Sequence, residues 1–282
     1  MKIFVYGATG NVSAPLTDKL LAAGHTVVAG TRHPEKMAPR PGLVPVKVES
    51  QKPQEGVAAL NGADAAFLIG PPLVADSFSA IAPFIEQAKK LGLKKVVLMT
   101  AWGVEFAPPE VPLRKLELLL ESSGLSYNIL RPNWFMQNFH SFWIGGILSD
   151  QAIYFPGGSA RASFVDARDI SAVAYELLVS DKFANRAFMV SGPESLNHDD
   201  AAARISAATG KTIVYRDVTA EAFKDSLHKA GLPADYVGIL GNIAQTLKDG
   251  HAAAVSDDVK LVTGKDPISF AQYAQDYRSR WL

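Results

Sequence analysis

Two features near the start of the chain have residue types and spacing suited to binding an anion. They are the glycine pair of Gly7-Ala8-Thr9-Gly10 and the arginine at position 32. A glycine turn lets a diphosphate lie against the backbone, because no side chain intervenes. A helix that follows the turn adds unpaired N–H groups and the positive end of its dipole. We therefore expect the phosphates of a cofactor to bind at this turn.

The spacing of the turn departs from the usual dinucleotide fingerprint. The fingerprint reads G-x-G-x-x-G, whereas this chain has Gly7-x-x-Gly10-x-x-Ser13. The context supports the assignment, since an apolar run at residues 2–6 predicts a strand and a helical pattern begins at about residue 11. Ser13 is small enough to approximate the third glycine. An ordinary strand-to-helix turn with no ligand is the alternative.

Arg32 bears on which dinucleotide binds. A second strand is predicted at residues 26–29, and Gly30-Thr31-Arg32-His33 follows it, with no carboxylate before Glu35. NAD sites place an acidic residue here for the ribose 2′-hydroxyl, whereas a 2′-phosphate calls for arginine. A guanidinium can fork onto a phosphate. Arg32 therefore favours NADP(H), and the alternative is a solvated surface arginine.

The elements that must position these residues alternate along the first half of the chain. Strands are predicted at 43–48, 65–69, 94–99 and 127–130, and helices at 53–60, 76–91 and 113–123. The run at 65–69 is apolar throughout, as in strands covered on both faces of a parallel sheet. This alternation predicts an α/β fold with a doubly wound parallel sheet of the Rossmann type. The turn Gly70-Pro71-Pro72 then lies at the carboxyl edge beside the cofactor, or it is a simple loop.

The pattern changes after about residue 149. Short strands and glycine turns come first, then a helix at 167–179 and a strand at 186–190. The last ninety or so residues are mostly helical, with one strand at 211–215. We predict an NADP(H)-binding domain over 1–150, on which 167–179 and 186–190 pack. A smaller substrate-binding lobe is predicted over 191–282, with 151–165 contributing.

Composition bounds the remaining functions. Lys plus Arg and Asp plus Glu both number 28, so no global field draws the chain to nucleic acid or an anionic membrane. The chain has no cysteine, which excludes disulfides, thiolate metal sites and a thiol nucleophile. It has no apolar run that could span a bilayer, and its first strand starts at residue 2, so we expect a soluble cytoplasmic protein. The six histidines lack ligand spacing, so no metal is expected. His198-Asp199-Asp200 is better explained as the first turn of a helix.

Five sequence blocks together resemble the NmrA-like branch of the short-chain dehydrogenases/reductases. They are GATGNVS at the start, TRHPEK after the second strand, ELLLESSGLSYNILRPNWFMQNF from Glu117, FVDARDISAVAYELL from Phe164 and GPESLNHDDAAARISAATGKTIVY from Gly192. The C-terminal stretch resembles in particular the NADPH-dependent quinone reductases and triphenylmethane reductases of that branch.

The resemblance implies roles for named positions. It implies a diphosphate site at Gly7, Ala8, Thr9, Gly10, Asn11 and Val12, and a 2′-phosphate site at Arg32. It implies nicotinamide-side contacts from Pro132, Asn133 and Phe135. Gly70, Pro71, Thr100 and Ala101 follow the carboxyl ends of two predicted strands and are expected to complete the cofactor site. A substrate pocket is expected between the sheet's carboxyl edge and the C-terminal lobe, with Trp102, Trp134 and Asn138 contacting the substrate.

Two departures from the family pattern concern proton transfer. The chain contains no Tyr-x-x-x-Lys pair. Tyr127 is followed four residues later by Arg131, but a strand is predicted there, so the two would not share a helical face. Leu113 stands where this branch often has lysine or histidine, four residues before Glu117, and leucine cannot move a proton. Thr100 falls where the superfamily often has serine and can at most hydrogen-bond a carbonyl. The catalytic residues therefore stay unassigned.

Loss of the acid/base pair favours acceptors that need little protonation. We expect an NADPH-dependent oxidoreductase that transfers a hydride to an electron-poor aromatic such as a quinone or dye, in a monomer or homodimer. Seven aromatic side chains are candidates for stacking walls, although most are expected to be core: Trp102, Phe106, Trp134, Phe135, Phe139, Phe142 and Trp143. The competing hypothesis is a non-catalytic NADP(H)-binding redox sensor of NmrA type.

Overall fold

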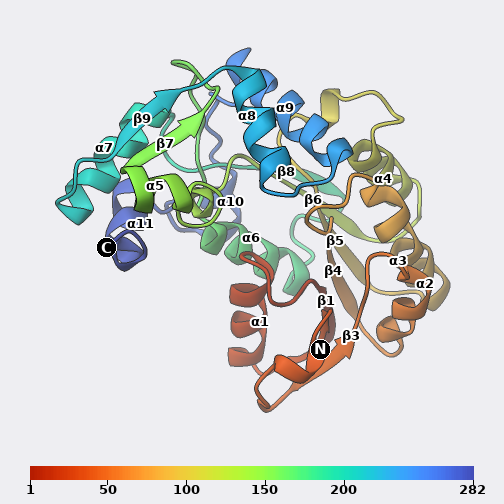
Figure 1. Cartoon of the computed structure of the whole chain (residues 1–282). Helices are drawn as coiled ribbons and strands as arrows, with labels where there is room; N and C mark the ends of the chain where they lie inside the picture. Colours follow the sequence, from red (N-terminus) through yellow and green to blue (C-terminus); the bar gives the residue numbers. More distant parts are fainter. The chain divides into compact units, whose positions relative to one another are not determined.

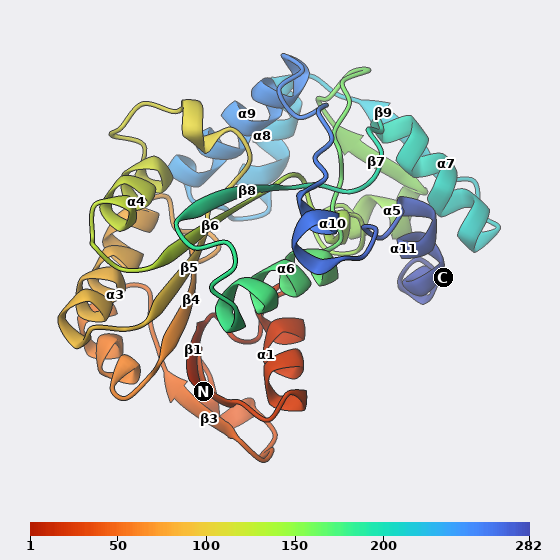
Figure 2. The same ribbon diagram turned by 180° about the vertical axis from the view of Figure 1, so that it is seen from behind.

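The chain forms two compact units in a computed structural model that describes residues 1–282 (Figures 1 and 2). Unit 1 comprises Met1–Pro132 and Ile170–Met189, and unit 2 comprises Asn133–Asp169 and Val190–Leu282. Two sequence segments therefore contribute to each unit. The division falls within a helix, a strand and the turn after another strand.

A seven-stranded sheet forms the centre of unit 1, in the order β3-β2-β1-β4-β5-β6-β8. The strands are β1 (Lys2–Tyr6), β2 (Thr26–Thr31), β3 (Leu43–Lys47), β4 (Ala65–Ile69), β5 (Lys95–Met99), β6 (Tyr127–Pro132) and β8 (Arg186–Val190). Pairing is parallel from β3 through β6, for example Ile3 with Val27 on one side and with Ala65 on the other. The order reverses between β1 and β4, as in a doubly wound fold. The predicted fold class is confirmed.

Helices cover both faces of this sheet (Figures 1 and 2). They are α1 (Ser13–Ala22), α2 (Pro53–Gly56), α3 (Ser77–Leu91), α4 (Pro112–Glu121) and the part of α6 (Ala167–Val179) from Ile170 on, with short 3₁₀ turns η1 (Pro34–Lys36), η2 (Val57–Leu60) and η3 (Val104–Phe106). On the α3 and α4 face, Phe84 stacks on Phe4 with ring centroids 5.6 Å apart. Leu116 and Leu120 of α4 belong to the same buried cluster.

Local signals in the sequence explain where α3 begins and ends. The Asp76 side chain accepts the N–H of Ser79 at 3.1 Å, which caps the helix start. Gly92 closes the helix with φ of 65°, a left-handed conformation that glycine adopts without strain. A helix was predicted here, and it starts one residue later than expected.

Unit 2 contains a two-stranded parallel sheet and most of the C-terminal helices. Its strands are β7 (Ala152–Phe155) and β9 (Val214–Asp217). Its helices are α5 (Ile144–Asp150), α7 (His198–Thr209), α8 (Ala220–Lys229), α9 (Ala234–Lys248), α10 (Asp258–Thr263) and α11 (Phe270–Asp276), with 3₁₀ turns η4 (Met136–His140) and η5 (Arg278–Arg280). The strand expected at 211–215 begins three residues later, because the segment from Lys211 to Ile213 first leads from α7 to the edge of β7.

Aromatic side chains dominate the core of unit 2. Phe139, Phe164 and Phe270 form edge-to-face pairs with centroids 5.0 to 5.9 Å apart. The first turn of α7 carries Asp199 and Asp200, as predicted, and a capping box joins Asn197 to Asp200. Those carboxylates therefore stabilise a helix start.

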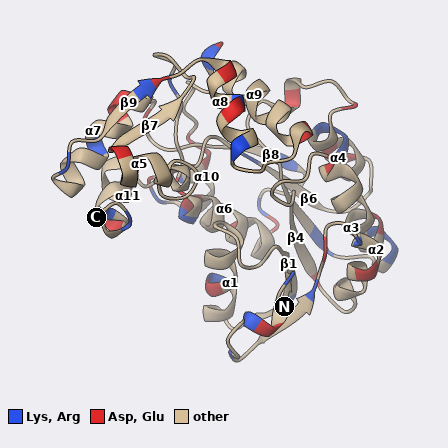
Figure 3. Cartoon of the chain, in the orientation of Figure 1, with Lys and Arg blue, Asp and Glu red and all other residues tan.

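Charged residues of both signs are interspersed in each unit (Figure 3). The equal totals of 28 basic and 28 acidic residues agree with this distribution. None of the helices combines the length and apolar character that crossing a bilayer requires.

Candidate dinucleotide site

The turn between β1 and α1 is built on backbone hydrogen bonds and one left-handed glycine. Gly7 has φ of +64°, which favours glycine. The N–H of Ala8 donates to Gly30 O at 2.9 Å, which ties the turn to the end of β2. The N–H of Gly10 donates to Gly7 O at 2.9 Å, and a Cβ at Gly10 would lie 3.3 Å from that oxygen. Gly10 thus has little room for a side chain.

The helix that follows presents an uncapped N-terminus. Val12 occupies the N-cap position without a side-chain hydrogen bond, and the first turn of α1 holds no acidic residue. Thr9 and Asn11 are exposed, and their backbone N–H groups donate to no acceptor in the protein. Free N–H groups at a positive dipole end are the donors that a diphosphate requires. The residues present therefore fit the phosphates of a dinucleotide.

Ser13 fills the third position of the glycine pattern and holds the helix to the sheet. Its side chain is 1% exposed, and its hydroxyl donates to Tyr6 O at 3.0 Å. The carbonyl of Val12, next to it, accepts the hydroxyl of Ser171 at 2.6 Å. In the usual fingerprint, a third glycine allows the helix to pack closely on the strand because it has no side chain. Here the small side chain of Ser13 is accommodated by its hydrogen bond to the strand.

Arg32 follows β2 and is exposed, and it forms no hydrogen bond or ion pair in the structure. The nearby carboxylate of Glu35 instead lies 3.2 Å from Nδ1 of His33. A free guanidinium beside the first βα turn is available for an anionic group. This geometry fits a 2′-phosphate without an acidic competitor bound to Arg32.

Gly70 and Pro71 follow β4 at the same carboxyl edge and are half-buried. A Cβ at Gly70 would lie 3.4 Å from Ser77 Cβ and 3.8 Å from Leu113 Cδ2, both ordinary contact distances. The structure therefore shows no steric need for glycine here. It does place Leu113, the position of the family's lysine or histidine, next to this turn.

A buried charged cluster, which sequence reasoning did not find, lies at the ends of β5 and β6. Its centre is Glu117 of α4, whose side chain is fully buried. Arg131 donates to it twice, from Nε at 2.9 Å and from Nη2 at 2.8 Å, and Arg114 donates from Nη1 at 2.7 Å. Thr100 Oγ1 donates to Glu117 Oε1 at 2.7 Å. Together with Glu105, whose Oε2 lies 3.6 Å from Arg131 Nε, these residues are called the Glu117 cluster below.

The protonation state of this cluster follows from its hydrogen bonds. Burial alone raises the pKa of Glu117, but hydrogen bonds from Arg131 and Thr100 outweigh it and hold that pKa below its ordinary value. Glu117 is therefore an anion that accepts four hydrogen bonds. The Thr100 proton is directed at Glu117, so this hydroxyl has no second proton to offer a substrate carbonyl. Its predicted carbonyl contact stays a prediction.

One sequence signal could have revealed the cluster. Leu113, Leu116, Glu117 and Leu120 follow the spacing of one helical face, so Glu117 interrupts an apolar stripe. A carboxylate on a buried face needs cationic partners. Which arginines pair with Glu117 depends on how α4 packs over β6, and the sequence alone does not show this packing.

The remaining predicted cofactor residues are divided between the two units. In unit 1, Pro132 O accepts the N–H of Trp102 at 3.0 Å and Ala101 O accepts that of Val104 at 3.3 Å. In unit 2, Asn133 is buried, and its Nδ2 donates to Ser163 Oγ at 2.7 Å and to Ala252 O at 2.9 Å. The side chain of Asn133 therefore holds loops of unit 2 together. Phe135, also in unit 2, is half-buried.

Burial separates the seven aromatic candidates. Phe139 and Trp143 are core residues of unit 2. Trp134 is half-buried and stacks on Trp143, with centroids 6.3 Å apart. Asn138 is half-buried and its carbonyl accepts the N–H of Trp143 at 2.9 Å. Exposed or half-buried candidates are Trp102 and Phe106 in unit 1 and Phe135 and Phe142 in unit 2.

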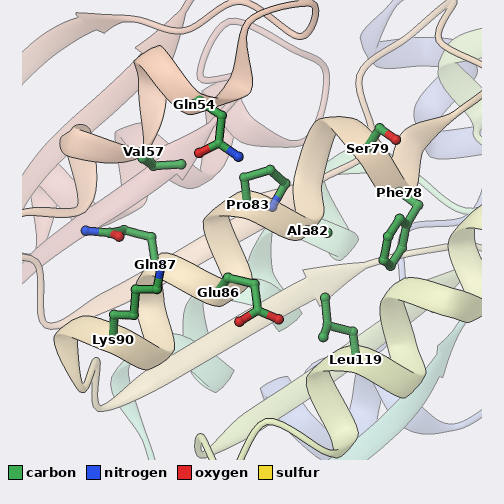
Figure 4. Close-up of a pocket in the computed structure, with 10 residues that line it drawn as sticks. All are labelled: Gln54, Val57, Phe78, Ser79, Ala82, Pro83, Glu86, Gln87, Lys90 and Leu119. Atoms are coloured by element: carbon green, nitrogen blue, oxygen red, sulfur yellow. The ribbon is translucent and has the colours of Figure 1, made fainter.

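A surface hollow of about 540 Å³ lies elsewhere in unit 1, between α2, α3 and α4 (Figure 4). Phe78, Pro83 and Glu86 of α3 line it, with Leu119 of α4 on the other side. None of the predicted site residues lines this hollow. It is therefore separate from the glycine turn between β1 and α1.

Comparison with known proteins identifies the family of the chain. The NAD(P)H-binding family matches residues 7–181, and the chain belongs to it. The NAD(P)H azoreductase of Xenophilus azovorans is 30% identical over 281 residues, which cover 97% of this chain and 96% of that protein. The chain is thus a member of a family of NAD(P)H-dependent oxidoreductases.

Solved structures share the fold at low sequence identity. Triphenylmethane reductase of Citrobacter sp. superposes with a TM-score of 0.82 at 20% identity, covering 98% of this chain and all of that one. NmrA, a negative transcriptional regulator solved with NADP, superposes with a TM-score of 0.78 at 16% identity, covering 99% of this chain and 95% of that one. The resemblance to the NmrA-like branch and its reductases is confirmed.

Proposed function

We propose that this chain is an NADPH-dependent oxidoreductase that transfers a hydride to an electron-poor aromatic acceptor such as a quinone or a dye. The observation that carries this substrate class is the absence of a proton donor among Thr100, Glu117 and Leu113. Thr100 donates to Glu117, Glu117 is an anion and Leu113 is apolar. An acceptor that requires no enzymatic acid fits such a site.

The choice of NADPH rests on Arg32 and the dinucleotide turn. The free guanidinium of Arg32 supplies the charge for a 2′-phosphate, and the uncapped start of α1 supplies N–H donors for the diphosphate. Gly7, Gly10, Asn11 and Val12 would hold the diphosphate. A bound reduced nicotinamide supplies the hydride, and the chain's part is to hold it against the acceptor and exclude water.

The chemistry of the acceptor explains how the reaction proceeds without an acid. A ketone that gains a hydride becomes a strongly basic alkoxide and needs a proton at once. A quinone that gains a hydride becomes a hydroquinone monoanion, which is stable enough to take its proton from water. A cationic triarylmethyl dye becomes a neutral product and needs no proton. Both fit a site with no free donor.

Further contacts are proposed for residues at the strand ends. Gly70, Pro71, Thr100, Ala101 and Pro132 of unit 1 would border the nicotinamide, and Trp102 would contact the acceptor. From unit 2 we propose Phe135 for the cofactor and Trp134 and Asn138 for the acceptor. The side-chain amide of Asn133 and its backbone N–H both have partners within unit 2, so we propose its backbone carbonyl for the cofactor contact.

A redox-sensing binder is the second candidate, and the same lack of a proton donor favours it. The shared fold with NmrA, solved with NADP, adds support. A sensor would bind NADPH tightly and would not oxidise it, whichever acceptor is added. An enzyme would oxidise it in the presence of at least one.

The deciding experiment is a titration with NADPH followed by a panel of quinones, azo dyes and triphenylmethane dyes. Absorbance of the reduced nicotinamide reports oxidation. We expect tight binding and acceptor-dependent loss of that absorbance. Tight binding with no oxidation by any member of the panel would contradict the reductase and favour the sensor.

Substitution of Arg32 tests the cofactor preference. Arg32→Ala should weaken NADPH binding by roughly 10- to 100-fold, because a charge-assisted hydrogen bond to phosphate is lost. NADH binding should change by less than about threefold. The matched control is Arg40→Ala, which removes an exposed arginine that instead pairs with Asp18. Equal weakening of NADPH and NADH would remove Arg32 from the 2′-phosphate site.

A further inference from the structure

Phe106 is the most exposed large apolar side chain of the protein. It is 87% exposed, and the next residue in that class, Leu282, is 58% exposed. A phenyl ring that stays in water contributes no hydrophobic stabilisation to the fold, because that stabilisation comes from burial. A ring held in this state is available to another apolar surface.

The segment that carries Phe106 is fixed on both sides of the ring. Before it, the N–H of Trp102 donates to Pro132 O at 3.0 Å, and Val104 is buried. The N–H of Phe106 itself donates to Gly103 O at 3.1 Å, and that of Ala107 donates to Val104 O at 3.0 Å. The ring is therefore exposed on an ordered turn, η3.

The neighbour of Phe106 connects this turn to the Glu117 cluster. Glu105 Oε2 lies 3.6 Å from Nε of Arg131, and Arg131 forms a two-pronged hydrogen bond with Glu117. The cluster that engages Thr100 thus also holds the turn carrying the ring. Its position relative to the end of β5 is set by charge as well as by backbone bonds.

The turn lies at the carboxyl edge of the sheet, the edge of the dinucleotide turn. Parallel β1, β4 and β5 end at Tyr6, Ile69 and Met99, so residues 7–12, 70–71 and 100–106 follow strand ends on one side. Ligands of doubly wound folds bind along this edge. A flat aromatic acceptor next to the nicotinamide would need an apolar surface here.

We propose that Phe106 is a specificity-determining residue whose ring stacks on the aromatic acceptor. This inference rests on the proposed function and assigns one wall of its acceptor site within unit 1. Offset or edge-to-face contact between rings adds to the burial of apolar area. The preference for flat aromatic acceptors would then come partly from a ring already held in place.

Three variants test the proposal in steady-state turnover of a quinone with saturating NADPH. Phe106→Ala should raise KM for the quinone roughly tenfold, while kcat changes by less than about twofold. Phe106→Trp should restore KM, because it keeps a flat ring. The matched control, Leu91→Ala, removes an exposed apolar side chain just before β5 begins, at the opposite edge of the sheet, and should change nothing.

Measurements of NADPH affinity and of the unfolding midpoint distinguish acceptor binding by Phe106 from cofactor binding and from a structural role. The affinity for NADPH and the unfolding midpoint should be the same in Phe106→Ala and the wild type, because the ring is exposed. An unchanged KM for the quinone would overturn the proposal. A loss of NADPH affinity as large as the change in KM would overturn it too, since Phe106 would then serve the cofactor.

Failure of the proposed reductase function gives a different result from failure of the Phe106 proposal. If no acceptor oxidises NADPH in the wild type, the reductase itself is contradicted. Equilibrium dialysis of a quinone against the NADPH-loaded protein then tests Phe106 directly. Weaker binding to Phe106→Ala than to Leu91→Ala would still support an aromatic-binding role, and equal binding would overturn it.

Discussion

Glu117 of unit 1 and His198 of unit 2 are both fully buried polar side chains, and their surroundings are opposite. Glu117 accepts hydrogen bonds from Thr100, Arg114 and Arg131. Neither ring nitrogen of His198 has a hydrogen-bond partner. His198 lies instead among aromatic rings, stacked with Phe155 and Tyr215 at centroid distances of 4.9 and 5.2 Å.

The two surroundings lead to different charge states, an anion at Glu117 and a neutral ring at His198. Donors around Glu117 hold its pKa below the ordinary value, so it stays an anion. Burial lowers the pKa of His198 to about 3, against a smaller opposite effect of Asp217, so it stays neutral. Unit 1 therefore contains a buried charge that its partners must neutralise, and unit 2 a buried base that must not be protonated.

Removing the charge of Glu117 should have the largest effect on stability. Glu117→Gln keeps the shape but leaves Arg131 and Arg114 without their anion. We expect the free energy of unfolding to fall by about 3–5 kcal/mol, as when one partner of a buried ion pair is removed. Denaturant unfolding measures this change.

The control for Glu117 lies on the same helix. Glu121 is 3.4 Å from Arg114 and its side chain is 32% exposed. Glu121→Gln should cost less than about 1 kcal/mol, because exposed ion pairs contribute little. Equal losses in the two variants would show that the Glu117 cluster is not a buried charge network in solution.

Mild acid should act on His198 and spare Glu117. In the unfolded chain His198 has an ordinary pKa near 6.5, whereas in the fold that pKa is about 3. The unfolded state therefore binds a proton first as pH falls through 6.5, and folding stability is lost down to about pH 3. Between pH 7 and pH 5 the loss is about 2 kcal/mol.

His198→Phe is the matched variant for this pH dependence. It keeps a flat ring between Phe155 and Tyr215 and removes the titrating group. The loss between pH 7 and pH 5, measured by denaturant unfolding, should shrink by about 2 kcal/mol. The part due to His140, whose pKa burial also lowers, should persist. An unchanged pH profile would mean that His198 is protonated in the fold.

The contrast between Glu117 and His198 also shows what the sequence can and cannot predict. Helix α3 was predictable because Asp76 and Gly92 mark its ends locally, and β4 because its apolar run is continuous. The glycine turn between β1 and α1 was predictable for the same reason, while its binding of a dinucleotide stays a prediction. Glu117 and its arginines were missed, because Arg131 is fourteen residues away and meets Glu117 only when α4 packs on β6.

Unit 2 gave weaker local signals. The buried state of His198 depends on rings from residues 139 to 215, which no periodicity connects. Asn133 was assigned to the cofactor from the family motif, while the structure gives its amide to Ser163 and Ala252. Side chains whose partners come from distant segments escape reasoning from local pattern.

The smallest expected effect isolates a single hydrogen bond of the Glu117 cluster. Thr100→Val removes a hydroxyl that donates to Glu117, but Arg131 and Arg114 still donate three hydrogen bonds to that carboxylate. We expect the free energy of unfolding to fall by about 1 kcal/mol and quinone turnover to fall less than about tenfold. Thr17→Val is the control, because the Thr17 hydroxyl is buried without a partner and its removal should be neutral or stabilising. Complete loss of turnover in Thr100→Val, with the fold retained, would contradict this expectation. It would show that the Thr100 hydroxyl, which donates to Glu117 in the structure, gives its proton to the acceptor during the reaction.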